Sequence, residues 1–244
     1  MLIFPLASGL AMGGVSWAGL AFATLAVTGF LAHESVLVVR GARGERIRSS
    51  EAAPARRRLL GLATIAVVAA GTFAATASAG AWRAALGTAV LAAAVGALLL
   101  AGKTKSIVGE LLVAATFSSV HAVLAAAGSA RAPATYLPVA AWVVCFTHAT
   151  LSVHALKRRF KGRGPGRWTV VAAPMLAGVV ALLGVVGVVV RHPLGTAAAP
   201  VLPKAIAVLA LSALPANPHH LKRVGWTFVV ADTLTLAALV WLLG

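Results

Sequence analysis

The chain has 244 residues, of which 60% are hydrophobic and 11% are charged, and its mean hydropathy is +0.95. This composition excludes an ordinary soluble domain, in which about 25% of the residues are charged. The formal net charge of +16 does not indicate nucleic-acid binding, because the basic residues lie between apolar segments and form no basic domain or arm. The single cysteine, Cys145, excludes an internal disulfide.

Eight apolar segments follow one another along the chain, and most reach the roughly 20 residues that a helix needs to cross a ~30 Å hydrocarbon core. They cover residues 17–39, 59–79, 82–100, 107–127, 135–156, 168–190, 200–214 and 223–243. A ninth segment, 1–12, is too short to span alone. We expect either that the true start lies upstream of Met1, which we prefer, or that this helix is short and shielded by its neighbours. The pattern predicts an all-α polytopic transmembrane bundle of eight or nine helices, forming one domain over residues 1–244.

The basic residues predict how this bundle is oriented. All but four of the 21 Lys and Arg residues lie in alternate gaps between the spans, above all in two basic loops at 40–58 and 157–167. The exceptions are Arg83, Arg131, Arg191 and Lys204. Cytoplasmic loops carry an excess of Lys and Arg, so we expect the basic loops in the cytoplasm and, with nine helices, the C-terminus outside.

Two sequence landmarks indicate an internal repeat of four helices. His33 and His148 each follow an apolar segment and precede a basic run, and Val-Gly pairs open the spans at 108–109 and 224–225. The two offsets, about 115 residues, pair residues 17–127 with residues 135–243; the alternative is coincidence in a chain rich in Ala and Val. Units with an even number of spans share one orientation, which implies a pseudo-twofold axis along the membrane normal. A cavity between the two units would then be the natural binding place.

Charged and histidine side chains inside the spans are candidate site residues, because a charge at mid-bilayer costs about 2.5–3.5 kcal/mol and usually faces protein or water. Their distances from the basic loops place several at similar depth, so we expect them to converge in a polar pocket that faces the cytoplasm. The predicted binding set is His33, Glu34, Arg40, Glu110, His148 and Asp232. His121 would lie deeper on the same helix face as Glu110. The alternative role for all of them is hydrogen bonding between helices without a ligand.

Other polar residues have simpler interpretations. Lys204 is expected to extend its ammonium to the outer surface, and His154 is expected at an interface between span and water. The sequence has no Gly-rich phosphate loop, no HExxH, no CxxC pair and no GxSxG. It therefore predicts no metal site and identifies no catalytic residue and no cofactor.

Several short motifs resemble the YwiC-like family of bacterial membrane proteins. They are Phe30-Leu31-Ala32-His33-Glu34 leading into Arg40, Glu110-Leu111-Leu112, and Gly225-Trp226. The resemblance covers nearly the whole chain and implies a multi-pass protein of the bacterial inner membrane. The family has no established activity that the resemblance could transfer.

Nine spans with polar ends on the second and sixth are also similar to the UbiA-type prenyltransferases. Those enzymes carry Asp-rich motifs at these two places, where Mg²⁺ holds a prenyl diphosphate. Here the places hold His33-Glu34 and His148 without an Asp, so the resemblance does not transfer the metal site, although Arg40, Lys157 and Arg158 could contact phosphate. Three functions stay open: a membrane protein with a cytoplasm-facing polar pocket, a transferase acting on a lipid or isoprenoid, and a transporter of small solutes or protons.

Overall fold

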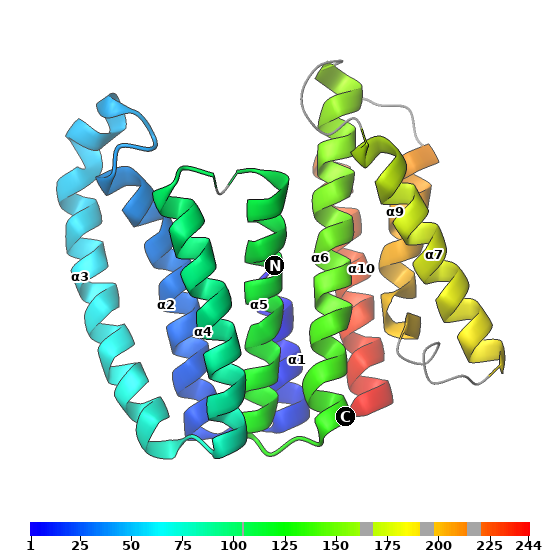
Figure 1. The fold of residues 1–244 in the computed structure, drawn as a ribbon, viewed down its shortest axis with the longest axis horizontal. Helices are drawn as coiled ribbons and strands as arrows, with labels where there is room; N and C mark the ends of the chain where they lie inside the picture. The colour runs from blue at the N-terminus through cyan, green and yellow to red at the C-terminus, as the bar shows by residue number, and fades with distance from the viewer. Residues whose placement is uncertain (104, 162–167, 191–197, 214–220) are drawn as a thin grey trace.

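The computed structural model describes residues 1–103, 105–161, 168–190, 198–213 and 221–244, and every regular element within them is a helix (Figure 1). The elements are α1 (Ile3–Gly13), α2 (Trp17–Val39), α3 (Glu45–Thr76), α4 (Ala79–Leu100), α5 (Ile107–Ala127), α6 (Ala132–Lys161), α7 (Thr169–Val190), the 3-10 turn η1 (Ala199–Val201), α9 (Leu202–Ala213) and α10 (Leu221–Leu243). Seven of these helices are long and apolar enough to cross a membrane, and α1 and the Ala199–Ala213 segment are shorter apolar helices. The prediction of a polytopic helical bundle is confirmed, and the chain is a multi-pass membrane protein.

Serine side chains start three of the spans. The hydroxyl oxygens of Ser16, Ser78 and Ser106 accept hydrogen bonds from the first turns of α2, α4 and α5. Such caps satisfy backbone N–H groups that have no partner inside a helix. They allow the turns between spans to stay short.

The segment expected as a basic loop at 40–58 is a turn only over residues 40–44. Gly41 and Gly44 adopt φ angles of 75° and 100° there, a backbone region that glycine enters without strain. From Glu45 onward the chain is helical, because Arg, Glu and Ala favour helix. The basic residues of this segment therefore lie on the first turns of α3. The second predicted loop, 157–167, likewise begins as the end of α6, and residues 162–167 lie outside the described part of the chain.

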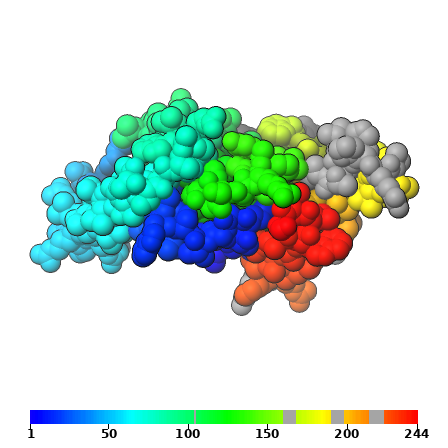
Figure 2. Space-filling view, turned by 90° about the horizontal axis from the view of Figure 1, so that it is seen from below, coloured from blue at the N-terminus to red at the C-terminus, as the bar shows by residue number. Residues whose placement is uncertain are grey.

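The helices form an elongated slab, with α3 at one end and α7 at the other (Figures 1 and 2). In the N-terminal part, α3 packs on α2 while α5 packs on both α2 and α4; in the C-terminal part, α6, α7, α9 and α10 pack together. The short α1 packs on α5, α6 and α10 and so joins the two parts.

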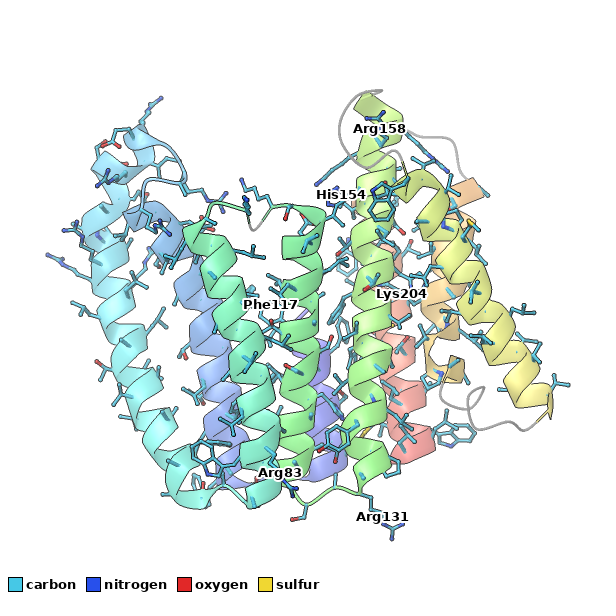
Figure 3. All side chains as sticks on the ribbon, in the orientation of Figure 1. Arg83, Phe117, Arg131, His154, Arg158 and Lys204 are labelled. Carbon is cyan, nitrogen blue, oxygen red and sulfur yellow. The ribbon has the colours of Figure 1, made fainter. Side chains whose placement is uncertain are left out.

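The two ends of the bundle differ in charge. Arg158 lies at the end that carries the α2–α3 and α4–α5 turns, whereas Arg83 and Arg131 lie at the other (Figure 3). We call the first the basic end and the second the opposite end.

Candidate functional site

A groove of about 590 Å³ lies among α2, α4 and α5 and is lined almost entirely by apolar side chains. This volume is within the about 300–1,000 Å³ that is usual for ligand sites. Phe22, Phe30 and Phe117 supply aromatic surface, and Phe117 lies near mid-height in the bundle (Figure 3). On α2 the lining runs from Phe22 to Val36, which is about 21 Å at 1.5 Å per residue. The groove is therefore long enough to hold a chain-like ligand.

Small residues create this space. Among the lining residues of α4 are three alanines and Gly96, and α2 contributes Gly29. A Cβ atom added at Gly29 or Gly96 would meet no other atom within 4 Å. These two glycines therefore widen the groove. Gly184 on α7 differs, because an added Cβ there would lie 2.7 Å from Leu202, so that glycine allows close packing.

The groove reaches the basic end beside a set of charged residues. His33 and Val36 of α2 and Leu99 of α4 line this part of it. The Arg40 guanidinium donates hydrogen bonds to the carbonyls of Leu99 and Leu100, at 3.4 and 3.2 Å. These carbonyls end α4 and carry the negative end of its dipole. Arg40 thus joins the ends of α2 and α4 across the mouth of the groove.

A second arginine at the mouth is paired with an acid. Arg43 donates from Nε to Glu34 Oε1 at 2.8 Å and from Nη2 to Oε2, and the carboxylate raises the pKa of the Arg43 guanidinium. Lys105 lies close enough to act electrostatically on Glu34. Beside the mouth, therefore, lie Arg40 and the Arg43–Glu34 pair, with Lys105 within electrostatic range of that pair.

The structure gives each of the three candidate acids its own basic partner. Glu34 pairs with Arg43 on the turn that follows α2, Glu110 of α5 pairs with His154 of α6 at 2.9 Å, and Asp232 of α10 pairs with Lys204 of α9 at 2.8 Å. Of the six predicted binding residues, it brings His33 and Arg40 to the groove, with Glu34 close by. Glu110, His148 and Asp232 contact other partners.

Lys204 and Asp232 form a buried ion pair. The Lys204 side chain has no exposed surface, and its Nζ lies 4.2 Å from the centre of the Phe228 ring. Figure 3 places Lys204 near mid-height among the helices. The expectation that Lys204 extends to the surface is wrong, because α9 starts inside the bundle and Asp232 supplies a partner there.

His121 belongs to a fully buried polar network at the junction of the two parts. Its Nε2 lies 2.8 Å from the Ala134 carbonyl and its Nδ1 lies 2.8 Å from Ser8 Oγ. A carbonyl only accepts, so Nε2 carries the proton and Ser8 donates to Nδ1. Trp142 Nε1 in turn donates to Ser8 Oγ at 2.9 Å. Every strong polar atom here is satisfied inside the protein, which indicates a structural role.

Within the described residues, no three His, Cys, Asp or Glu side chains lie close enough together to hold a metal ion. Sequence reasoning missed the groove, because its lining comes from small apolar residues of three helices with no distinctive motif. It also missed Ser8 and Trp142, since neither residue type marks a network until the fold brings them together.

The fold and the groove define a polytopic helical membrane protein with a long apolar groove that ends beside basic side chains. The model of the YwiC-like protein family matches residues 1–125, more than half of the chain, and the chain belongs to this family. The matched region contains every residue that lines the groove. No curated protein and no solved structure matches the chain.

Proposed function

We propose that this chain binds a lipid or isoprenoid molecule with an anionic headgroup, with the apolar chain in the groove and the headgroup at its mouth. The observation that carries the proposal is the 590 Å³ apolar groove on the three helices α2, α4 and α5. Burial of apolar surface contributes about 25 cal/mol per Å², so a chain that fills such a groove gains stability with every methylene.

The charges at the mouth favour an anionic headgroup. Arg40 contacts only carbonyls among its hydrogen-bond partners that the structure gives, so no carboxylate neutralises its charge. Arginine binds phosphate through a planar pair of N–H donors, and such charge-assisted hydrogen bonds are stronger than neutral ones. Lys105 adds a second cation, while Glu34 compensates Arg43. A phosphate or diphosphate fits this balance better than a neutral headgroup.

The proposed orientation follows from the same residues. The positive-inside rule places the basic end in the cytoplasm of a bacterial inner membrane. The headgroup would then face the cytoplasmic leaflet.

A UbiA-type transferase is the second candidate, and the groove favours it in one respect. Such an enzyme needs an apolar channel for a prenyl chain that leads to cationic side chains for the diphosphate. His33 and Arg40 lie where that channel would end. A transferase would also need groups that activate the leaving diphosphate, and these would have to act at the mouth.

The test compares two leucine substitutions on one helix. Gly96→Leu projects a side chain into the groove. Gly87→Leu adds the same side chain nine residues earlier, on the opposite face of α4 and away from the groove. An added Cβ meets no atom within 4 Å at either position, so both variants should fold. Native mass spectrometry of the full chain extracted from membranes would identify and count the bound molecules.

We expect wild type and Gly87→Leu to retain the same anionic lipid or isoprenoid, and Gly96→Leu to lose about tenfold or more of it. Arg40→Gln combined with Lys105→Gln should weaken retention of the anionic species while neutral lipids bind as before. Equal retention by the two leucine variants would refute binding in the groove. A neutral molecule as the main retained species would refute the assignment of the headgroup.

A further inference from the structure

A second polar region lies in the C-terminal part, on α6, a helix that does not line the groove. Cys145, His148, Ser152 and Arg159 follow one another at intervals of three, four and seven residues. Residues at these intervals lie on one side of a helix. The side chains therefore form a polar stripe along α6 that leads from the basic end into the bundle.

Two atoms of this stripe are buried without a partner in the described part of the chain. They are His148 Nε2 and Ser152 Oγ, which lie one helical turn apart. His148 is fully buried, its Nδ1 lies 2.8 Å from the Val144 carbonyl, and the Leu176 carbonyl of α7 lies near the ring without completing a hydrogen bond to Nε2. With the proton on Nδ1, Nε2 is an acceptor. More than about 90% of buried polar groups bond to protein or to ordered water. An acceptor and a hydroxyl left together in this way are therefore the usual surroundings of buried water.

A small cavity adjoins Ser152 at the basic end. It measures about 30 Å³ and is lined by Ser152 and Arg159 of α6, Ser212 of α9 and Val224 of α10, among others. One water needs roughly 10–15 Å³ of such volume, so the cavity has room for about two. Arg159 donates a hydrogen bond to the Ser212 carbonyl at 2.9 Å, and its exposed side chain connects this place to the surface.

The stripe leads to the buried ion pair. The inner end of the stripe contacts α10 close to the turn that carries Asp232, and the Lys204 ammonium lies within electrostatic range of His148 and Cys145. Cys145 Sγ also lies 4.0 Å from Thr235 Oγ1 on α10, one turn from Asp232. The ionisable groups within electrostatic range of the pair are His148 and Cys145 from α6 and the amino group of Met1.

We propose that ordered water fills the small cavity, hydrogen-bonds to Ser152 Oγ and His148 Nε2, and links the Lys204–Asp232 pair to the aqueous phase at the basic end. The pair is then a mid-membrane site that exchanges protons with that phase. This site is separate from the lipid groove and does not depend on it.

The first test is hydroxyl-radical labelling of the full chain in lipid nanodiscs, since radicals formed from bound water label the side chains beside it. His121 is the matched internal control, because it is as fully buried as His148 but both of its ring nitrogens have protein partners. We expect His148 to be labelled about tenfold more than His121, and Ser152→Val to remove most of the difference. Equal labelling of the two histidines in the wild type would overturn the proposal, whether or not the variant folds.

The second test follows the exchange of Cys145, the sole thiol of the chain, after transfer into D₂O. Its S–H infrared band is free of overlap from other cysteines. We expect the band to disappear at least about tenfold faster in the wild type than in Ser152→Val, while Ser152→Ala, which leaves space for water, stays close to the wild type. Slow exchange in the wild type, or equal rates in wild type and Ser152→Val, would show that no water connects Ser152 to the pair.

Discussion

The N-terminal helices α2–α5 and the C-terminal helices α6–α10 each contain a cavity, and the two cavities differ greatly in size. Each cavity lies among the first, third and fourth helices of its set: α2, α4 and α5 in one case, α6, α9 and α10 in the other. The first measures about 590 Å³ and the second about 30 Å³. In each set an arginine at the end of the first helix donates to carbonyls near the end of the third, Arg40 to Leu99 and Leu100, and Arg159 to Ser212.

The two halves also differ at a pair of polar positions. An offset of 116 residues, within the range of the predicted repeat, pairs Lys204 with Thr88 and Asp232 with Thr116, and both threonines line the groove. At these positions the C-terminal half holds the buried ion pair between α9 and α10, whereas the N-terminal half holds two threonines that line the groove. If the predicted repeat is real, one helical arrangement holds an open apolar groove in one half and a buried ion pair in the other.

The repeat itself stays a prediction. An experimental structure should allow α2–α5 to be superposed on α6–α10 by a rotation about the membrane normal, with His33 falling near His148. If three or more helices fail to superpose, or if the copies are inverted, the corresponding cavities arose independently.

The largest effect should come from breaking the buried pair. Asp232→Ala leaves the Lys204 ammonium buried without its carboxylate, and removing one partner of a buried pair costs about 3–5 kcal/mol. Chemical unfolding of the detergent-solubilised chain would measure the loss. Glu34→Ala is the control from the other half, because its pair with Arg43 is exposed and should contribute little. Equal losses in the two variants would show that the buried pair has no special role in closing the C-terminal half.

A smaller effect is expected at the junction between the halves. Ser8→Ala removes the hydroxyl that joins His121 to Trp142 and leaves a buried acceptor and a buried donor without partners. Such a loss costs about 1–3 kcal/mol, to be measured in the same unfolding experiment. Thr24→Ala, which removes an exposed hydroxyl bonded only to its own helix, should leave stability unchanged. If Ser8→Ala is also neutral, the network does not hold α1 between the halves.

The smallest structural effect should come from single cysteines placed outside the core. They test which end of the bundle faces the cytoplasm. In a Cys145→Ala background, Ser49→Cys should react with a membrane-impermeant thiol reagent only from the cytoplasm and Ser129→Cys only from outside, by the positive-inside rule. Labelling of intact cells and of inverted vesicles measures this. Reaction of position 49 in intact cells would reverse the proposed orientation of the groove.

The sequence predicted the spans well, because length and hydropathy alone determine them. The limits of α2 and α5 coincide with the predicted 17–39 and 107–127. The partners of the polar residues could not be predicted, since they depend on how helices rotate and pack. Lys204 shows this: its distance from a loop suggested the surface, but the path of the chain through η1 buried it. The groove escaped prediction because glycine and alanine predict close packing and open space equally well, and only the fold distinguishes them.

The buried contacts of Ser8 also bear on how the protein is made. Ser8 leaves the ribosome long before either of its partners, because His121 and Trp142 are synthesised more than a hundred residues later. Until α5 and α6 have entered the membrane, the Ser8 hydroxyl of α1 has neither of these two partners, the imidazole of His121 and the indole of Trp142. Although α1 is translated before α2–α10, it should therefore be among the last of these helices to dock.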